Sequence, residues 1–253
     1  MGEVDLLKII ILSIIQAITE FLPISSSAHL LLPSKLLGWP DQGIIFDITV
    51  HAATLAAVLL FFRKEFLDIN FYKSRMFLLL VLATMPLVAS ALLIPGLGNR
   101  WTLSSIAIAN IVFGILLLIS TYVGKKNKQN GRMKVWEAFF IGLFQCFSLI
   151  SGASRSGTAI TAALFLGFNK TDAAKFSLML SIPTIAGAIL FSILDMSNLE
   201  ANVSILTTFT GFLTTFIFSY ISIDIFLKIV KSIGYAPFVL YRMLLGILIL
   251  WLI

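Results

Sequence analysis

Long apolar runs are the feature that most restricts how this chain can fold. Segments such as MFLLLVLATMPLVASALLIPGL and FVLYRMLLGILILWLI approach or exceed the roughly 18 to 20 residues that a membrane-spanning helix needs. Hydrophobic residues make up 59% of the 253-residue chain and charged residues only 12%, which is more apolar than a soluble domain. The ten-residue alternating strands of a membrane barrel are missing, so helices must form the spans. We therefore predict an all-α polytopic membrane protein.

Two apolar stretches do not read as simple spans. Residues 6–37 and 135–168 are long enough to cross, but PISSSAH interrupts the first and SGASRSGTAIT the second. Unwound backbone is tolerated at membrane depth only where protein or a water-filled cavity satisfies its polar groups. We therefore predict two re-entrant helical hairpins at these stretches. Six transmembrane helices are expected in addition, at 44–62, 76–94, 104–124, 173–193, 203–227 and 237–253.

The two broken stretches are related by an internal repeat. Sliding the chain by 129 residues places Gln16 on Gln145 and PISSSA on GASRSG. Apolar helices match by chance easily, so the alignment is suggestive only. We predict one membrane domain, 1–253, in which a first repeat covers 1–124 and a second covers 135–253.

The distribution of Lys and Arg predicts the topology. Connections 63–75 and 125–134 carry four and five of these residues, whereas 95–103 carries one and 194–202 none. The positive-inside rule places the two basic connections in the cytoplasm. The later connections obey the same rule only if 135–168 enters the membrane and returns to the side from which it came. The repeats are then inverted, both chain termini lie outside, and the hairpin tips meet near the midplane. The basic residues occupy short connections, so the net charge of +6 does not indicate nucleic-acid binding.

Glu20 and Arg155 are the principal site candidates, because an ionisable group at membrane depth costs at least about 2.5–3.5 kcal/mol and is usually retained for function. We take Arg155 as the only positive charge deep in the membrane. Gln16 lies one helical turn before Glu20 and is expected on the same face. The structural alternatives are an ion pair that only locks the hairpins together, and an inter-helix hydrogen bond from Gln16.

Hydroxyl and amide donors surround these two charges. The predicted anion-binding residues are Ser25, Ser26, Ser27, Gly152, Ser154, Arg155 and Ser156. Donors of this kind, together with a guanidinium, form a cradle for a phosphate. Because the cradle lies in a membrane, we expect the phosphate to belong to a lipid. Serines that bond back to their own helix, and a His29 that is merely packed, are the alternatives. His51 is left open between a packed histidine and a site residue.

The motifs carry a resemblance to a known family. QAITEFLPISSSAHL resembles the first signature of the undecaprenyl-diphosphate phosphatase (bacitracin-resistance) family, and SGASRSGTAIT resembles the second, Pro-Gly-x-Ser-Arg-Ser-x-x-Thr. The segment FDITVHAATLAAVLLFFRK is similar to the helix that follows. Ser151 stands where the motif has proline, and Ala159 where it has threonine.

The resemblance implies hydrolysis of undecaprenyl diphosphate to the monophosphate, at a site open to the outer face of the cell membrane. It also implies a divalent cation, magnesium or calcium, with Glu20 and Gln16 as its ligands. By the same resemblance Glu20, Ser26, His29 and Arg155 are catalytic. Whether Ser26 is the nucleophile or His29 activates water stays open. Oligomeric state is also open, with a homo-oligomer as one arrangement.

Two other classes of protein compete with the phosphatase. A transporter or flippase of a polyprenyl phosphate is the chief rival, since broken helices that meet at mid-membrane are usual in secondary transporters. A structural subunit would leave Glu20 and Arg155 without a purpose. A hydroxyl and a histidine beside an arginine favour the enzyme.

Overall fold

The chain is all-α throughout the part described by its computed structural model, residues 6–94, 102–124, 133–195 and 204–253. The predicted fold class is therefore confirmed. The α-helices are α1 Leu6–Thr19, α2 Ser26–Leu37, α3 Gly43–Phe61, α4 Arg63–Phe66, α5 Arg75–Leu93, α6 Leu103–Val123, α7 Val135–Gln145, α8 Arg155–Phe165, α9 Lys170–Asp195, α10 Ile205–Ser232 and α11 Ala236–Leu252. Two short 3₁₀ helices, η1 Ile69–Lys73 and η4 Cys146–Leu149, complete these elements.

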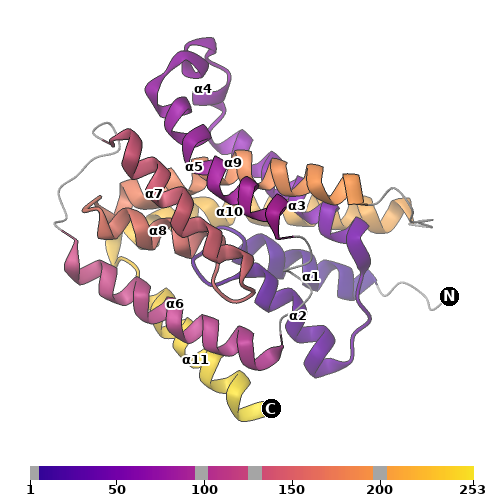
Figure 1. Ribbon diagram of the computed structural model, residues 1–253. Coiled ribbons are helices and arrows are strands. Elements are labelled where there is room, and N and C mark those ends of the chain that lie inside the picture. Colours follow the sequence, from indigo (N-terminus) through magenta and orange to yellow (C-terminus); the bar gives the residue numbers. More distant parts are fainter. Residues whose placement is uncertain (1–5, 95–101, 125–132, 196–203) are drawn as a thin grey trace.

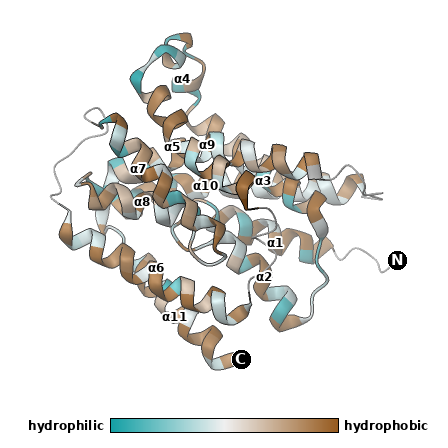
Figure 2. Ribbon diagram, viewed as in Figure 1, coloured by the Kyte–Doolittle hydropathy of each residue, from teal (hydrophilic) through white to brown (hydrophobic). Residues whose placement is uncertain are grey.

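Five of these helices, α3, α5, α6, α9 and α10, are long and apolar enough to cross a membrane. The sixth expected span is the shorter apolar helix α11. Large apolar side chains remain on the outer surface, such as Leu92 at 64% and Leu244 at 59% exposure. In Figure 2 most of α6 and α11 has the colour of hydrophobic residues, whereas hydrophilic residues gather at α4. Such a surface suits lipid rather than water, and the chain is a multi-pass membrane protein.

The two polar interruptions break helices where the sequence predicts. In the first stretch α1 ends at Thr19 and α2 begins at Ser26, after Pro23. In the second, α7 and η4 are followed by a turn through Gly152, and α8 begins at Arg155. Ser25 and Ser154 precede α2 and α8 with φ of 73° and 71°, a conformation that non-glycine residues rarely adopt. Matching strained serines at equivalent positions support the repeat.

Helix packing follows the same correspondence. The hairpin helix α1 packs on α10, and its counterpart α7 packs on α5. Helix α3 packs on α10 as α9 packs on α5, while α6 and α11 lie together at one side of the bundle (Figure 1). These pairings are the ones expected of a repeat with halves 1–124 and 135–253, and the repeat itself stays a prediction. The inverted orientation in the membrane stays a prediction, and most of 95–103, 125–134 and 194–202 lies outside the described residues.

The second hairpin's helix α8 is enclosed by protein, whereas α2 of the first hairpin is mostly partly exposed. Every residue of α8 from Ser156 to Leu164 is buried. Helix α1 approaches α10 at Gly211, and Thr215 of α10 donates a hydrogen bond to the Ser13 carbonyl. The hairpin tips lie together at the centre of the fold.

Candidate active site

An ion pair joins the two hairpin tips. Arg155 Nη2 lies 2.7 Å from Glu20 Oε1, although the residues are far apart in the sequence. Glu20 follows the last turn of α1 and is 7% exposed, while Arg155 opens α8. The two polar motifs therefore come together at one place, as their sequences predict.

The other carboxylate oxygen of Glu20 is held by the first hairpin. Ser26 Oγ donates to Glu20 Oε2 at 2.8 Å, and Gln16 Nε2 donates to the same oxygen at 3.1 Å. Gln16 Oε1 is buried without a hydrogen-bond partner. This unpaired oxygen lies on the residue next to the carboxylate, so it is available to a ligand.

The remaining serines form two matching pairs. Ser25 and Ser27 hydroxyls are 3.2 Å apart, and Ser154 and Ser156 hydroxyls are 3.1 Å apart. Ser154 also caps α8 by accepting from the Gly157 amide at 3.1 Å. Ser156 donates to the Leu22 carbonyl at 2.8 Å, which ties the second hairpin to the first.

Gly152 shapes the second turn. Its φ is +99°, and a Cβ atom there would lie 2.5 Å from the Ile106 carbonyl oxygen. Gly152 and Ser156 do not line either cavity described below. Their predicted contact with substrate stays a prediction, and their observed contacts hold the turns in place.

A second deep arginine corrects the expectation that Arg155 is the only one. Arg242, within α11, is 0% exposed. Its guanidinium donates to the carbonyls of Pro23 in the first turn and of Gly152 and Ala153 in the second, at 2.8 to 3.0 Å. Arg242 therefore satisfies the unwound backbone of both tips at once. The signal was present in the sequence, because an arginine inside an apolar span is rarely without a role.

The two histidines lie in different surroundings. His29 Nδ1 contacts the Ser25 carbonyl at 2.7 Å, and Nε2 contacts the Tyr241 hydroxyl at 2.5 Å. His51 Nδ1 contacts the Asp47 carbonyl at 2.7 Å, and Nε2 lies 3.9 Å from Glu20 Oε2 and 3.4 Å from Gln16 Nε2. The structure thus brings His51 to the carboxylate, and His29 to Tyr241. The catalytic role of His29 stays a prediction.

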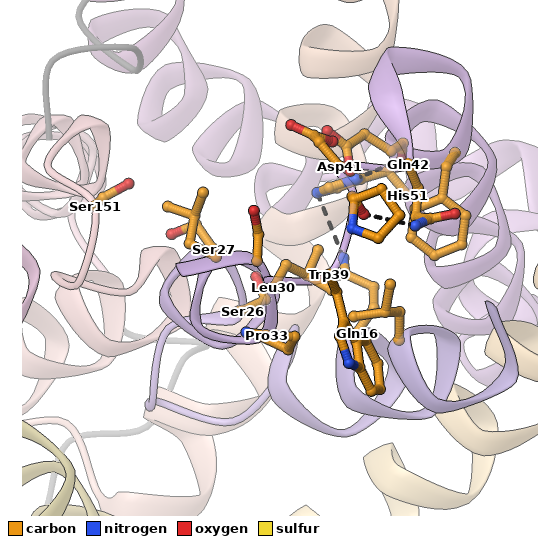
Figure 3. A pocket seen from close by; sticks show the side chains of 16 residues that line it. Gln16, Ser26, Ser27, Leu30, Pro33, Trp39, Asp41, Gln42, His51 and Ser151 are labelled. Atoms are coloured by element: carbon orange, nitrogen blue, oxygen red, sulfur yellow. Dashed lines mark hydrogen bonds between the residues drawn. The ribbon is translucent and has the colours of Figure 1, made fainter. Parts of the chain in front are cut away.

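Two cavities meet at Ser26, Ser27 and His51. The first, which we name the vestibule, has a volume of about 330 Å³ and includes Gln16 and the 39–42 connection (Figure 3). The second, which we name the groove, has a volume of about 580 Å³ and reaches Glu20, Arg155 and Ser154 before continuing between α5 and α9. The site is thus accessible from two directions.

This arrangement places a guanidinium and a hydroxyl on the same carboxylate. The Arg155 guanidinium donates a hydrogen bond through Nη2 to Glu20, and the Arg155 side chain also lines the groove. A hydroxyl 2.8 Å from a carboxylate meets the geometry of a nucleophile beside its base. The fold and site define a polytopic membrane protein with an internal cluster of an arginine, a carboxylate and several hydroxyls.

Comparison with known proteins makes the assignment more specific. Residues 9–248 match the family model of bacitracin resistance protein BacA. The undecaprenyl-diphosphatase of Alcanivorax borkumensis is 42% identical over 98% of this chain and 99% of its own length. That of Aliivibrio salmonicida is 42% identical over 95% and 96%, and undecaprenyl-diphosphatase 1 of Pseudoalteromonas translucida is 40% identical over 96% and 97%. The chain belongs to the BacA family.

Ser151 and Ala159, the two residues that depart from the family signature, differ in burial. Ser151 lines the vestibule, and Ala159 is buried within α8 at 2% exposure. The neighbouring threonine hydroxyls bond to their own helix, Thr158 to the Arg155 carbonyl and Thr161 to the Gly157 carbonyl. Neither departure removes a contact of Glu20 or Arg155.

Proposed function

We propose that this protein hydrolyses undecaprenyl diphosphate to undecaprenyl monophosphate and phosphate. The observation that carries the proposal is the constellation of Arg155, Glu20 and Ser26 at the meeting point of the two hairpins. The names of the relatives support the same reaction over a transporter or flippase. Such a reaction recycles the lipid carrier of cell-wall synthesis, and it fits the bacitracin-resistance description of the family.

Arg155 is the group that binds the diphosphate. Its planar fork engages two phosphate oxygens together, and its side chain is 15% exposed at the groove. The Ser25 and Ser27 hydroxyls line the same groove and add neutral donors. Because these groups are fixed before substrate arrives, little reorganisation is needed as charge develops.

Glu20 and Ser26 are the groups placed for proton transfer. A hydroxyl oxygen, from Ser26 or from water, bonds to the terminal phosphorus while the bond from that phosphorus to the bridging oxygen breaks. The bridging oxygen leaves with the prenyl monophosphate, and the hydroxyl proton moves to Glu20 Oε2. If Ser26 attacks, water hydrolyses the phosphoserine in a second step and restores the hydroxyl.

The site also fits a divalent cation. Glu20 supplies a carboxylate and Gln16 an unpaired buried oxygen, while no cluster of three or more His, Cys, Asp or Glu is present in the described residues. Magnesium typically takes one or two carboxylates together with substrate phosphate oxygens rather than a complete protein cage, and calcium also prefers oxygen ligands. Bound there, the cation would neutralise charge on the phosphate oxygens.

We further propose that the site opens to the outer face. Helix α3 begins beside the vestibule and ends at the 63–75 connection, which carries four Lys and Arg. By the positive-inside rule the latter end is cytoplasmic, so the vestibule lies at the outer end. Both chain termini are then outside.

Phosphate release from pure undecaprenyl diphosphate tests the proposed function. Detergent-solubilised protein should release phosphate, and a chelator should reduce the rate until magnesium or calcium is restored. A transporter would bind the lipid and leave the diphosphate intact. Absence of phosphate release with either cation would overturn the proposal.

A further inference from the structure

The groove changes character along its length. At its inner end lie the charged and hydroxyl groups Glu20, Arg155 and Ser154. Farther out it runs between α5 and α9, where most lining residues are apolar, among them Leu87, Leu92, Ile185, Leu190 and Phe191, with hydroxyls only at Thr184 and Ser192. A site with one polar end and a long apolar continuation suits a ligand with a charged head and a hydrocarbon chain.

Gly187 keeps this continuation open. A Cβ atom added at Gly187 would meet only Val88 Cγ2, at 4.0 Å. Other helical glycines are crowded, since a Cβ at Gly142 would lie 2.4 Å from the Ala83 carbonyl oxygen. Close helix packing therefore explains Gly142 but not Gly187. At Gly187 the missing side chain leaves space in the groove.

We propose that the groove between α5 and α9 binds the first isoprene units of the polyprenyl chain while Arg155 holds the diphosphate. The inference rests on the proposed function and adds the position of the lipid chain to it. The polar and apolar parts of the groove are continuous, because one cavity contains both the Glu20–Arg155 ion pair and the apolar walls. Its volume of about 580 Å³ lies within the usual range for small-ligand sites.

The geometry also separates the lipid from the leaving phosphate. The groove and the vestibule share Ser26, Ser27 and His51, and they extend from these residues to different lining residues. With the chain in the groove, the terminal phosphate faces the vestibule. The remainder of a long chain leaves the groove past its most exposed lining residues, Leu92 and Leu194, toward the surrounding lipid.

Filling the groove at Gly187 tests the proposal. Gly187→Phe should raise KM for undecaprenyl diphosphate at least ~10-fold with kcat within about twofold of wild type, because binding is lost and the catalytic groups are untouched. Ala186→Phe is the matched control, since Ala186 is exposed on the same helix and does not line the groove. The control should keep the wild-type KM. Equal KM values for both variants would overturn the groove assignment.

A labelling measurement tests the groove without turnover. Ala188 lines the groove, and a Cys146→Ser background removes the chain's single natural cysteine. Maleimide labelling of Ala188→Cys should slow at least ~5-fold with saturating undecaprenyl monophosphate and stay unchanged with inorganic phosphate. Unchanged labelling with the prenyl monophosphate would contradict the proposal. Protection by a protein that releases no phosphate would instead retain the groove and reject the phosphatase.

Discussion

Ser26 and Arg155 are the first residues of α2 and α8, and each donates a hydrogen bond to a different oxygen of the Glu20 carboxylate. They occupy equivalent positions in the repeat, and each follows a serine with positive φ. The same broken-helix geometry therefore delivers a hydroxyl from one half and a guanidinium from the other. One carboxylate joins a nucleophile candidate to an anion binder.

Replacing the Glu20 carboxylate tests whether its contacts with Ser26 and Arg155 serve catalysis. Glu20→Gln should lower turnover at least ~10²-fold with the fold retained, because an amide neither balances Arg155 nor accepts a proton as well. The measurement is phosphate release together with thermal stability in detergent. Glu65→Gln is the control, being the same substitution in the exposed helix α4, and should change neither quantity. Normal activity in Glu20→Gln would remove its assigned role.

We expect Arg242 to stabilise the fold, whereas Arg155 is proposed to bind the diphosphate. Arg242→Met should lower the free energy of unfolding by about 3–5 kcal/mol, because buried carbonyls in both turns lose their charged donor. Activity should fall with stability. The matched control is Leu244→Met in the same helix, at a position 59% exposed. A wild-type melting temperature and turnover rate in Arg242→Met would show that Arg242 does not stabilise the two hairpin tips.

Gln16 offers a test of the cation. Gln16→Glu should lower the magnesium concentration for half-maximal activity severalfold, because a second carboxylate binds a hard cation better than an amide oxygen. Gln16→Leu should raise it. A titration of phosphate release against magnesium measures both shifts. Identical titration curves for the three proteins would exclude Gln16 as a ligand.

The sequence predicted the helical spans, both helix breaks and the pairing of Glu20 with Arg155, because these follow from local hydropathy and from the cost of charge in a membrane. The partners of Arg242 and the direction of His51 required the structure, although an arginine inside an apolar span already marks Arg242 as a candidate. The contacts of Arg242 depend on how α11 packs beside α6 and on room left by Gly157, where a Cβ atom would lie 2.9 Å from Arg242 Nη1. The rotation of α3 sets the direction of His51, and the periodicity of a span apolar on all sides does not show that rotation.

Membrane orientation is testable by cysteine labelling. In a Cys146→Ser background, Asp41→Cys should react with an impermeant maleimide from outside, whereas Leu67→Cys and Lys175→Cys should react only after permeabilisation. All three positions are exposed, so accessibility reports the side of the membrane. Reaction of Lys175→Cys from outside would refute the inverted repeat.

We propose that the Glu20–Arg155 pair is a catalytic centre rather than an ion pair that only holds the hairpins together. The most direct measurement is phosphate release from undecaprenyl diphosphate by purified wild-type and Arg155→Lys proteins, with thermal stability recorded on the same samples. Lysine keeps the charge beside Glu20 but loses the fork that engages two oxygens. We predict that Arg155→Lys keeps the wild-type melting temperature and loses at least ~10²-fold in turnover. Full activity in this variant would contradict the account and leave Arg155 as scaffold.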